Sequence, residues 1–366
     1  MNDFEEYIRQ GEPEKKEKSY AWQTAIGLQQ VDGLKPSAYL IEIAKQNIEG
    51  DITIDEVKHL IDHYYKTKTV RTDDDDRTEE ADKVSARITE ILSEKTFSFS
   101  PTEYINIHRR LFNGLYKFAG KIRNYNITKS EWALNGETVL YAGADNLKAT
   151  LEYDFEQEKN FNYKGLSKLQ IVKHIAHFIA YLWQIHIFGE GNTRTTAVFL
   201  IKYLRKLGFE HVNNDIFAQH SWYFRNALVR ANYNNLKNNI HATNEHVERF
   251  LRNLLLDENN VLKNRELHIN YAAPENISNL SNKTGDVNGG ANNENGGVNG
   301  GVSLLQKQII DFMRQNPRIS VAEIAKQTNK PRRSIENNVK KLKEKGIISR
   351  VGSDKTGSWK VEIIKT

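Results

Sequence analysis

The stretch that decides the fold reads His186-Ile187-Phe188-Gly189-Glu190-Gly191-Asn192-Thr193-Arg194-Thr195-Thr196-Ala197. An apolar run, residues 171–188, leads into it, and a second apolar run follows at residues 198–201. The pattern predicts a helix, a tight loop and a second helix. Gly189 and Gly191 allow a sharp turn that presents successive backbone N–H groups. Because the second helix should begin near Arg194, its positive end would face the loop and favour a phosphate group.

Three side chains in this stretch suit phosphoryl chemistry. Arg194 offers a fixed cationic fork for phosphate oxygens. Glu190 would repel phosphates unless it holds Mg²⁺, which prefers carboxylate and phosphate oxygens together. His186, at the end of the first helix, suits a general base for a hydroxyl nucleophile. A purely structural role stays open for these residues, because a histidine at a helix end and a Gly-x-Gly pair are common features.

Two other groups of polar residues are weaker candidates for metal sites. His174 and His177 stand at i and i+3, but residues 171–188 are apolar nearly all round, which favours core or loop-contacting histidines. Polar residues interrupt this run, so it indicates a buried helix and not a membrane span. Residues 73–76 are consecutive aspartates, which we interpret as a solvated loop or a helix start.

The stretch from His186 to Arg194 resembles the signature of the Fic family, His-Pro-Phe-x-(Asp/Glu)-Gly-Asn-Gly-Arg-x-x-Arg. Further matches lie at His108 to Arg123, at Asn135-Gly136 and at Ser221 to Leu228, so that the resemblance spans residues 85–255. It implies an all-helical core with one β-hairpin flap. It also implies ATP as co-substrate and transfer of AMP to a Ser, Thr or Tyr hydroxyl of a protein.

The resemblance implies a role for each residue that matches the signature. His186 would deprotonate the target hydroxyl, Phe188 would anchor the loop, and Glu190 would coordinate Mg²⁺ between the α- and β-phosphates. The residues implied in binding ATP are Gly189, Gly191, Asn192, Thr193, Arg194 and, for the adenine, Tyr223. Catalysis would then rest on positioning and charge stabilisation.

The chain departs from the family signature at three positions. Ile187 replaces the proline, which changes only the stiffness of the loop. Thr193 replaces a glycine, and its Cβ could narrow the phosphate site. Ala197 replaces the second arginine, so that one contact to the terminal phosphate is missing. The last two changes put the orientation of ATP, and hence the transferred group, in doubt.

A β-hairpin is predicted between residues 132 and 141. Asn135-Gly136 stands there between aromatic and β-branched residues, which is the strongest short signal for a hairpin turn. By resemblance to the family, this flap would align an extended target segment by edge pairing. The residues expected to dock the target are Trp132, Leu134, Thr138 and Val139.

Residues 39–64 resemble an inhibitory element of many Fic proteins, a helix that carries (Ser/Thr)-x-x-x-Glu-(Gly/Asn). Gly50 is typical of a helix C-cap and places Glu49 at the helix end. The resemblance implies that Glu49 occupies the γ-phosphate region and inhibits the enzyme. Lys45 stands where Ser or Thr is expected, and Ala197 removes the usual arginine partner. A solvated glutamate at a helix end stays open as the alternative.

The basic charge of the chain is concentrated in residues 303–366, which hold 15 Lys and Arg against 6 Asp and Glu, whereas residues 1–302 hold 37 against 41. A capping box at Ser320 and Glu323 and an alternating pattern at residues 359–363 resemble a winged helix-turn-helix. The residues expected to contact DNA are Arg332, Arg333, Asn337, Asn338 and Lys341. A protein-docking role stays open for the same module.

These patterns divide the chain into segments. Residues 1–84 form an N-terminal helical region with the inhibitory motif, residues 85–271 the catalytic domain, residues 272–302 a flexible linker and residues 303–366 the winged helix-turn-helix domain. Asn and Gly fill 15 of the 31 linker positions, so the linker cannot bury apolar surface. The fold class expected is mainly α, a Fic-type helical core with a β-hairpin flap followed by a small α+β winged-helix domain.

The function expected is ATP- and Mg²⁺-dependent AMP transfer to a protein target, possibly the enzyme itself, with DNA as a second partner and no membrane. The polar N-terminus lacks a signal-peptide pattern, which favours the cytoplasm. The chain has no Cys, so disulfides and thiolate metal sites are excluded. Two other functions stay open: a DNA-binding regulator whose Fic domain senses a nucleotide, and an enzyme that removes AMP from modified proteins.

Overall fold

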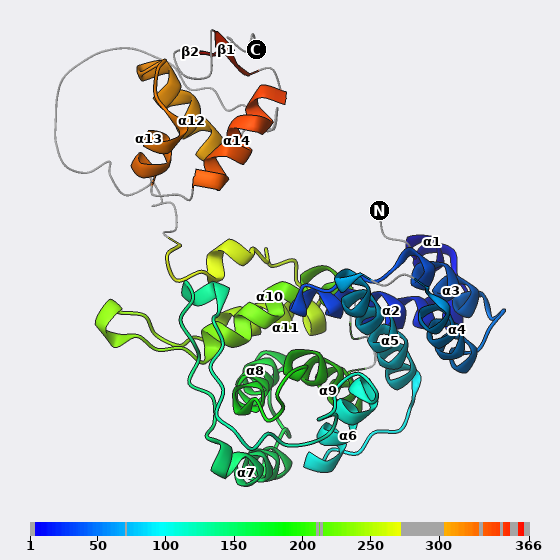
Figure 1. Cartoon of the computed structure of the whole chain (residues 1–366). Helices are drawn as coiled ribbons and strands as arrows, with labels where there is room; N and C mark the ends of the chain where they lie inside the picture. The colour runs from blue at the N-terminus through cyan, green and yellow to red at the C-terminus, as the bar shows by residue number, and fades with distance from the viewer. Residues whose placement is uncertain are drawn as a thin grey trace. The chain divides into compact units, whose positions relative to one another are not determined.

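The computed structural model of the 366-residue chain describes residues 4–69, 72–209, 212, 215–271, 304–328, 332–344, 347–351 and 358–361. The chain divides into two compact units, residues 1–276 and 277–366 (Figure 1). The predicted linker, residues 272–302, lies outside the described residues.

The first unit is built from helices and short 3-10 turns. In chain order they are α1 (Glu5–Gln10), α2 (Pro13–Gly27), η1 (Leu28–Asp32), α3 (Ala38–Glu49), α4 (Ile54–Thr67), α5 (Asp73–Ser93), α6 (Pro101–Phe112), η2 (Trp132–Leu134), η3 (Ala144–Asn146), α7 (Leu147–Asn160), α8 (Lys168–Ile185), α9 (Asn192–Lys206), α10 (Asp215–Ala231), η4 (Leu236–Asn238), α11 (Glu245–Leu256) and η5 (Asn264–Leu267).

The centre of this unit is formed by α8 and α9, which pack against each other (Figure 1). A capping box joins Ser167 and Gln170 at the start of α8 and satisfies backbone N–H groups there. Because α9 is buried from Asn192 to Leu204 and α8 is buried along its apolar side chains, both helices are covered on several sides. α7 and α11 cover α8, and α5 and α6 cover α9. The predicted helix, loop and helix at residues 171–201 are thus confirmed.

The N-terminal helices enclose a second apolar cluster, which includes Trp22, Ile43, Ile48 and Tyr65. α2 lies against both α5 and α10. At Gly27 a Cβ would lie 2.5 Å from the Ala218 Cα, so only glycine permits this approach of α2 to α10. The following turn, η1, contacts α9, and this contact brings the N-terminal region to the predicted loop.

The aspartate run at residues 73–76 is the start of α5, as one interpretation predicted. Thr72 is the N-cap, and its N–H donates to the Asp75 carboxylate at 2.7 Å in a capping box. Carboxylates in the first turn suit the positive end of a helix. The aspartate run therefore forms the start of α5.

Farther along α5, Asp82 is buried and accepts hydrogen bonds from Ser37 and Tyr65.

The predicted hairpin turns at the expected place, but its arms do not form strands. Asn135 (φ 55°) and Gly136 (φ 91°) both adopt the left-handed conformation that a tight hairpin turn requires. Glu131 N donates to Glu137 O, but Trp132–Leu134 coil into η2 instead of extending. The reason is burial: Ala133 and Leu134 are fully buried in the main core, which an extended arm would not reach.

The second unit has the elements predicted for a winged helix-turn-helix. They are α12 (Leu304–Gln315), α13 (Val321–Gln327), α14 (Arg332–Glu344) and an antiparallel pair, β1 (Ile348–Val351) and β2 (Ser358–Val361). The capping box of Ser320 and Glu323 begins α13. Ile335, Val339 and Leu342 are buried along one stripe of α14, so the predicted apolar face is confirmed.

None of the helices in the described ranges is both long enough and apolar enough to cross a membrane.

Candidate active site

Hydrogen bonds of the Asn192 side chain stabilise the loop between α8 and α9. His186 ends α8 with φ 49° and ψ 53°, in the left-handed region. Asn192, the first residue of α9, spans the loop: its Nδ2 donates to Phe188 O at 2.8 Å, and its Oδ1 accepts from Phe188 N at 3.0 Å. Both ends of the amide are thus used within the loop. The side chain predicted to hold phosphate therefore braces the loop, and the backbone N–H groups at the start of α9 stay the natural anion site.

The loop glycines are required by space. Gly191 has φ 75°, and a Cβ there would lie 2.4 Å from the Phe112 ring. At Gly189 a Cβ would lie 2.6 Å from the Tyr125 hydroxyl. At Gly191 a larger residue would therefore displace the loop, whereas at Gly189 the half-exposed Tyr125 side chain could move instead.

His108 of α6 packs against the loop. Its ring stacks on Phe188 with centroids 3.7 Å apart. Gly120 N donates to Nδ1 at 2.9 Å, so the ring proton lies on Nε2, which is 3.0 Å from Glu190 O. Burial lowers the pKa of His108 to about 4. The ring is therefore neutral at neutral pH and keeps one donor and one acceptor.

Aromatic rings enclose His186, the predicted base. Its side chain is buried, with the Tyr141 ring 4.3 Å and the Trp183 ring 5.0 Å from the imidazole, centroid to centroid. Tyr141 is fixed in turn, because its hydroxyl donates to Glu131 Oε1 at 2.9 Å and Glu131 pairs with Arg225 at 2.7 Å. This buried network holds the flap residue against the imidazole.

The protonation state of His186 suits a base. Nδ1 lies 3.3 Å from Trp183 O, which assigns the ring proton to Nδ1 and leaves a lone pair on Nε2. Burial, and then the positive charges of Lys129, Arg225 and Arg123, lower the pKa of His186 well below its usual range. The imidazole is therefore neutral at neutral pH and able to accept a proton. The same cations give the site a positive field.

Glu190, the predicted Mg²⁺ ligand, extends from the loop toward solvent. Its side chain is 55% exposed and pairs with Lys129 Nζ at 2.9 Å. No group of three or more His, Cys, Asp or Glu suited to a metal occurs within the described ranges. The residues therefore fit a magnesium ion held by one carboxylate together with phosphate oxygens, which is its usual mode, and not an all-protein cage. Lys129 would have to release the carboxylate first.

Arg194 is buried and ion-paired with protein carboxylates, although its Nε, close to Asp32, makes no hydrogen bond within the described residues. It is 1% exposed, and its Nε and Nη2 pair with Asp32 at 2.7 Å and Glu80 at 2.6 Å. Nη1 donates to Gln29 Oε1 at 3.0 Å, and Nη2 also lies 3.2 Å from the Tyr116 hydroxyl. Burial opposes the charge, but the neighbouring acidic groups outweigh it and raise the pKa of Arg194. The fork predicted for phosphate is thus occupied by carboxylates from η1 and α5.

The two substitutions that put ATP orientation in doubt both point into the core. Thr193 is buried, and its Oγ1 accepts from Trp183 Nε1 at 2.9 Å. The threonine methyl and hydroxyl therefore fix the indole that contacts His186. Ala197 is fully buried on α9. An arginine at that position would need space that the described packing does not leave.

Several residues predicted to contact ligands are core residues. Tyr223 is fully buried on α10, with its hydroxyl 3.5 Å from His246 Nδ1, so the predicted adenine contact is not available. Leu134 and Val139 are likewise buried, so they cannot dock a target. Packing places these apolar side chains in the core instead. Trp132 is 43% exposed and Leu140 is 84% exposed, and these residues form the accessible apolar surface of the flap.

The predicted Thr138 contact is internal as well. Its hydroxyl accepts from Lys129 N at 3.2 Å across the base of the turn. His174 and His177 also have internal partners. His174 Nε2 lies 2.6 Å from Glu158 Oε2, and the Nδ1 of His177 lies 3.3 Å from the Asn244 amide. The interpretation of this pair as core or loop-contacting histidines agrees with these contacts.

The placement predicted for Glu49 is wrong. Glu49 does end α3, followed by Gly50 at φ 90°. Its carboxylate, however, pairs with Lys15 at 2.6 Å and is 39% exposed. Among the described residues, the carboxylates that contact Arg194 come from Asp32 and Glu80. Ile48, one residue before Glu49, packs in the N-terminal apolar cluster, whereas the apolar residues of the loop belong to the main core.

Sequence reasoning missed Asp32 and Glu80, although a signal for Asp32 exists. Asp32-Gly33 has the same form as Glu49-Gly50: an acid at the end of a helical turn, then a glycine with φ 67°. A motif that requires glutamate does not match Asp32. Glu80 lies in the charged first half of α5, and nothing in its local sequence distinguishes it from neighbouring acids.

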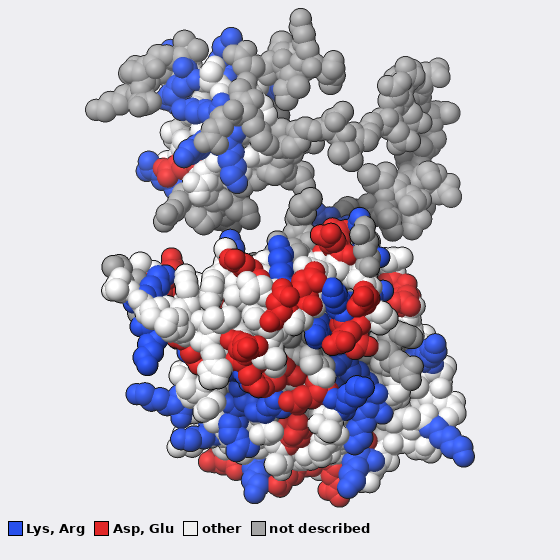
Figure 2. Space-filling view, turned by 90° about the vertical axis from the view of Figure 1, so that its right-hand side faces the viewer, with Lys and Arg blue, Asp and Glu red and all other residues white. Residues whose placement is uncertain are grey.

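The residues predicted to contact DNA lie on α14. Arg332, Asn337 and Lys341 are exposed, Asn338 is partly exposed, and the Arg333 side chain lies outside the described atoms. Figure 2 shows mainly Lys and Arg among the described charged side chains of the second unit, whereas both signs are mixed on the first. Arg332 pairs with Glu336 at 2.8 Å, so a phosphate would compete for it.

Two protein families match separate segments of the chain. The Fic/DOC family matches residues 98–204, and the winged helix-turn-helix DNA-binding family matches residues 303–349. Protein adenylyltransferase VbhT of Bartonella schoenbuchensis is 27% identical over 109 residues, which are 30% of this chain. That match spans only 21% of the length of the curated relative.

Two solved structures are also similar. One is the N-terminal FIC domain of Bep8, a VirB-translocated effector protein of Bartonella sp. 1-1C, at 16% identity and a TM-score of 0.40 over 51% of this chain and 88% of that one. The other is a Fic family protein of Desulfovibrio desulfuricans G20, at 12% identity and a TM-score of 0.43 over 98% of this chain and 94% of that one.

Proposed function

Because the chain carries a Fic/DOC domain at residues 98–204 and a winged helix-turn-helix domain at residues 303–349, we propose that it transfers AMP from ATP to a hydroxyl group of a protein. The observation that carries this proposal is His186: a neutral, buried imidazole beside a glycine loop at the N-terminus of α9. A base and an anion site on one loop are what hydroxyl attack on a phosphate requires.

The proposed step follows from the contacts of the loop. The target hydroxyl oxygen attacks the α-phosphorus of ATP while its proton passes to Nε2 of His186. The bond from the α-phosphorus to the bridging oxygen breaks, and pyrophosphate leaves. The N–H groups at the start of α9 stabilise the charge on the α-phosphate. A magnesium ion, held by Glu190 and the phosphates, would neutralise charge on the leaving group.

We further propose that the described state is restrained by Asp32 and Glu80. Arg194 is the signature residue expected to hold the departing phosphates, and both carboxylates occupy it. Phosphate oxygens would therefore have to displace two charge-assisted contacts. Displacement of η1 from α9 would remove Asp32 from the guanidinium, and Glu80, on α5, would have to release it separately. Inhibition is thus assigned to Asp32 and Glu80 in place of Glu49.

Mass spectrometry of the full chain tests the proposed transfer. Wild type, Asp32→Asn/Glu80→Gln and Asp32→Asn/Glu80→Gln/His186→Ala are each incubated with ATP, Mg²⁺ and lysate protein. We expect AMP adducts that increase in the double variant and fall by roughly 10²–10⁴-fold in the triple variant. Adducts that persist in the triple variant would remove His186 from the mechanism. A folded double variant that modifies neither itself nor lysate protein would contradict AMP transfer.

For the second unit we propose DNA binding through α14. The exposed basic side chains of this helix and the matched family support it. Duplex binding should weaken steeply with salt, since each neutralised phosphate releases about 0.9 counterion. Arg332→Ala/Lys341→Ala should reduce this salt slope, and Lys15→Ala, on the first unit, serves as the matched control. Salt-insensitive binding would favour a protein-docking role.

A further inference from the structure

A pocket of about 660 Å³ lies between α7, α8 and the flap. Flap residues Leu140 and Tyr141 form one side of it, and Tyr153, Phe161 and Tyr181 bring aromatic rings from α7, the segment after it and α8. Tyr153 is 60% exposed and Tyr181 is 47% exposed. A hollow of this size accepts a long side chain or a small ligand. The partly exposed rings of Tyr153 and Tyr181 are suited to pack against such an occupant.

Two carboxylates stand four residues apart on the same face of α7, and they differ sharply in their partners. Glu158 is buried and accepts hydrogen bonds from the hydroxyls of Tyr163 and Tyr203, while its other oxygen lies 2.6 Å from His174 Nε2. Asp154 has no hydrogen bond or ion pair to any of the described residues. Burial alone raises the pKa of Asp154 to about 6. At neutral pH this carboxylate is therefore ionised, half-buried and uncompensated.

The charge of the pocket favours a positive occupant. No Lys or Arg is found among its described lining residues, which include both carboxylates. His177 is held by Asn244, and its pKa is lowered by burial and then by His174. A carboxylate beside the faces of tyrosine rings is the arrangement that binds ammonium and guanidinium groups.

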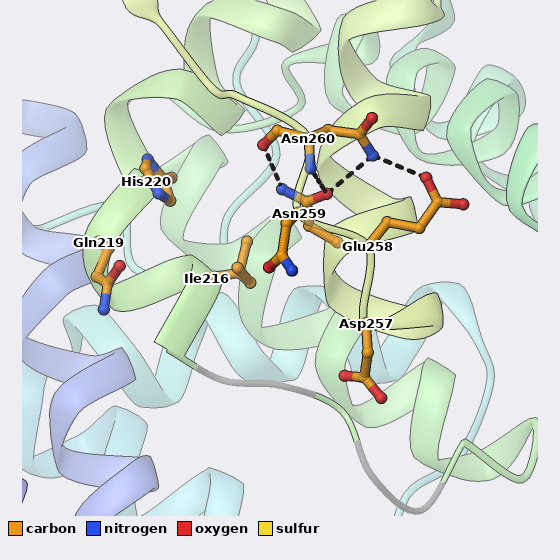
Figure 3. A pocket seen from close by; sticks show the side chains of 8 residues that line it. Ile216, Gln219, His220, Asp257, Glu258, Asn259 and Asn260 are labelled. Carbon is orange, nitrogen blue, oxygen red and sulfur yellow. Dashed lines mark hydrogen bonds between the residues drawn. The ribbon is translucent and has the colours of Figure 1, made fainter.

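A second pocket, between α10 and the chain after α11, shows the contrast (Figure 3). Its polar groups bond to one another: Asn260 N and Nδ2 both donate to Asn253 Oδ1, and Asn260 Nδ2 also donates to Glu258. Glu258 pairs with Arg252 as well. These groups need no ligand to satisfy them. Asp257 also lines this pocket, but its side chain is exposed and therefore solvated. Of these two pockets, the one between α7, α8 and the flap is the one with a half-buried carboxylate that pairs with none of the described residues.

The pocket is adjacent to the proposed base. Tyr141 lines it and also contacts the His186 ring at 4.3 Å, and Ile185 lines it directly before His186 in the chain. An occupant therefore lies about one side chain away from the reacting hydroxyl. We propose that this pocket binds a lysine or arginine side chain of the target protein, a few residues from the modified hydroxyl. The identity of the occupant rests on the proposed transfer to proteins.

A binding experiment without ATP separates this proposal from the transfer itself. The full chain is titrated with the peptide acetyl-Gly-Lys-Gly-Ser-Gly-Gly-amide, and the control is the same peptide with Nε-acetyl-lysine. A series of related peptides places the lysine one to four residues from the serine. Dissociation constants are measured by NMR titration. We expect at least one register to bind roughly tenfold more tightly with lysine than with acetyl-lysine, because acetylation removes the charge.

Asp154→Asn should remove this preference while the protein stays folded, because the change deletes an uncompensated charge. Glu152→Gln is the matched control: this carboxylate is 57% exposed, belongs to the same helix and does not line the pocket. A preference that survives Asp154→Asn, or that is missing in every register, would overturn the proposal. So would equal affinity for free Nα-acetyl-lysine amide, which would indicate a small-molecule pocket. A lack of AMP adducts would leave this binding result unaffected.

Discussion

Two short segments of the N-terminal region end in the same way and serve different purposes. Asp32-Gly33 ends η1 and Glu49-Gly50 ends α3, and both glycines are left-handed, with φ 67° and 90°. The Asp32 carboxylate pairs with Arg194, which is 1% exposed, whereas the Glu49 carboxylate pairs with Lys15, which is 33% exposed. Local conformation is therefore shared, and the partner determines the role.

The difference shows that the contribution of an ion pair to stability depends on its burial and not on the local sequence motif. A buried charge whose partner is removed costs several kcal/mol, because it was taken out of water to make the contact. An exposed pair is screened by solvent and contributes about 0–1 kcal/mol. Asp32 thus holds a buried arginine beside the loop, whereas Glu49 fastens α3 to α2 at the surface.

The largest expected effect is on stability. Arg194→Ala should lower the free energy of unfolding of the first unit by about 3 kcal/mol, because it leaves Asp32 and Glu80 facing each other without a cation. Lys15→Ala, the matched change at the other helix end, should cost less than about 1 kcal/mol. Urea unfolding followed by tryptophan fluorescence measures both. Equal losses would mean that burial does not separate the two sites.

The next effect is on activity. Asp32→Asn/Glu80→Gln should raise the initial rate of AMP transfer about tenfold or more, since a charge-assisted contact is worth roughly 1.5–3 kcal/mol. ATP affinity should rise in parallel, because the same guanidinium becomes available. Initial rates and calorimetric titrations with ATP are the measurements. A rate equal to that of wild type would show that Arg194 is not limiting.

Glu49→Gln is the counterpart at the surface helix end. It should leave both the rate of AMP transfer and the affinity for ATP within about twofold of wild type, because the pair with Lys15 is exposed. The same assays measure it, in protein shown to be folded by circular dichroism. A tenfold activation by Glu49→Gln would restore the inhibitory role that its motif predicts.

A pH-dependent effect on stability is expected at Asp154, a carboxylate without a partner among the described residues. Because the folded pKa of Asp154 is raised from 3.8 to about 6, the native state binds the proton more tightly than the unfolded state. Its stabilising contribution is therefore full below pH 3.8 and is lost as pH rises through 6. Since Asp154 is only half-buried, we expect Asp154→Asn to add only about 1 kcal/mol at pH 7 and nothing near pH 4. Unfolding curves at both pH values test this.

Part of the site could be predicted because it depends on local geometry. A histidine after an apolar helix, a glycine with positive φ at Gly191 and an Asn192 that starts the next helix are features of residues 186–194 themselves. The turn at Asn135-Gly136 was predictable for the same reason, since few residues accept two successive positive φ values. The coiling of Trp132–Leu134 was not, because it depends on the core below.

The sequence by itself determined the helix, loop and helix around residues 186–194 and the winged-helix elements, and it singled out the histidine that we propose as the base, because spacing and conformational preference act within a few residues. Only the tertiary structure decided that Tyr223 and Val139 lie in the core, that Asn192 braces the loop and that Arg194 is bound by Asp32 and Glu80. Arg194 and Asp32 stand far apart in the chain. Their contact exists because α2, with glycine at its close approach to α10, carries η1 onto α9, and only folding brings such distant charges together.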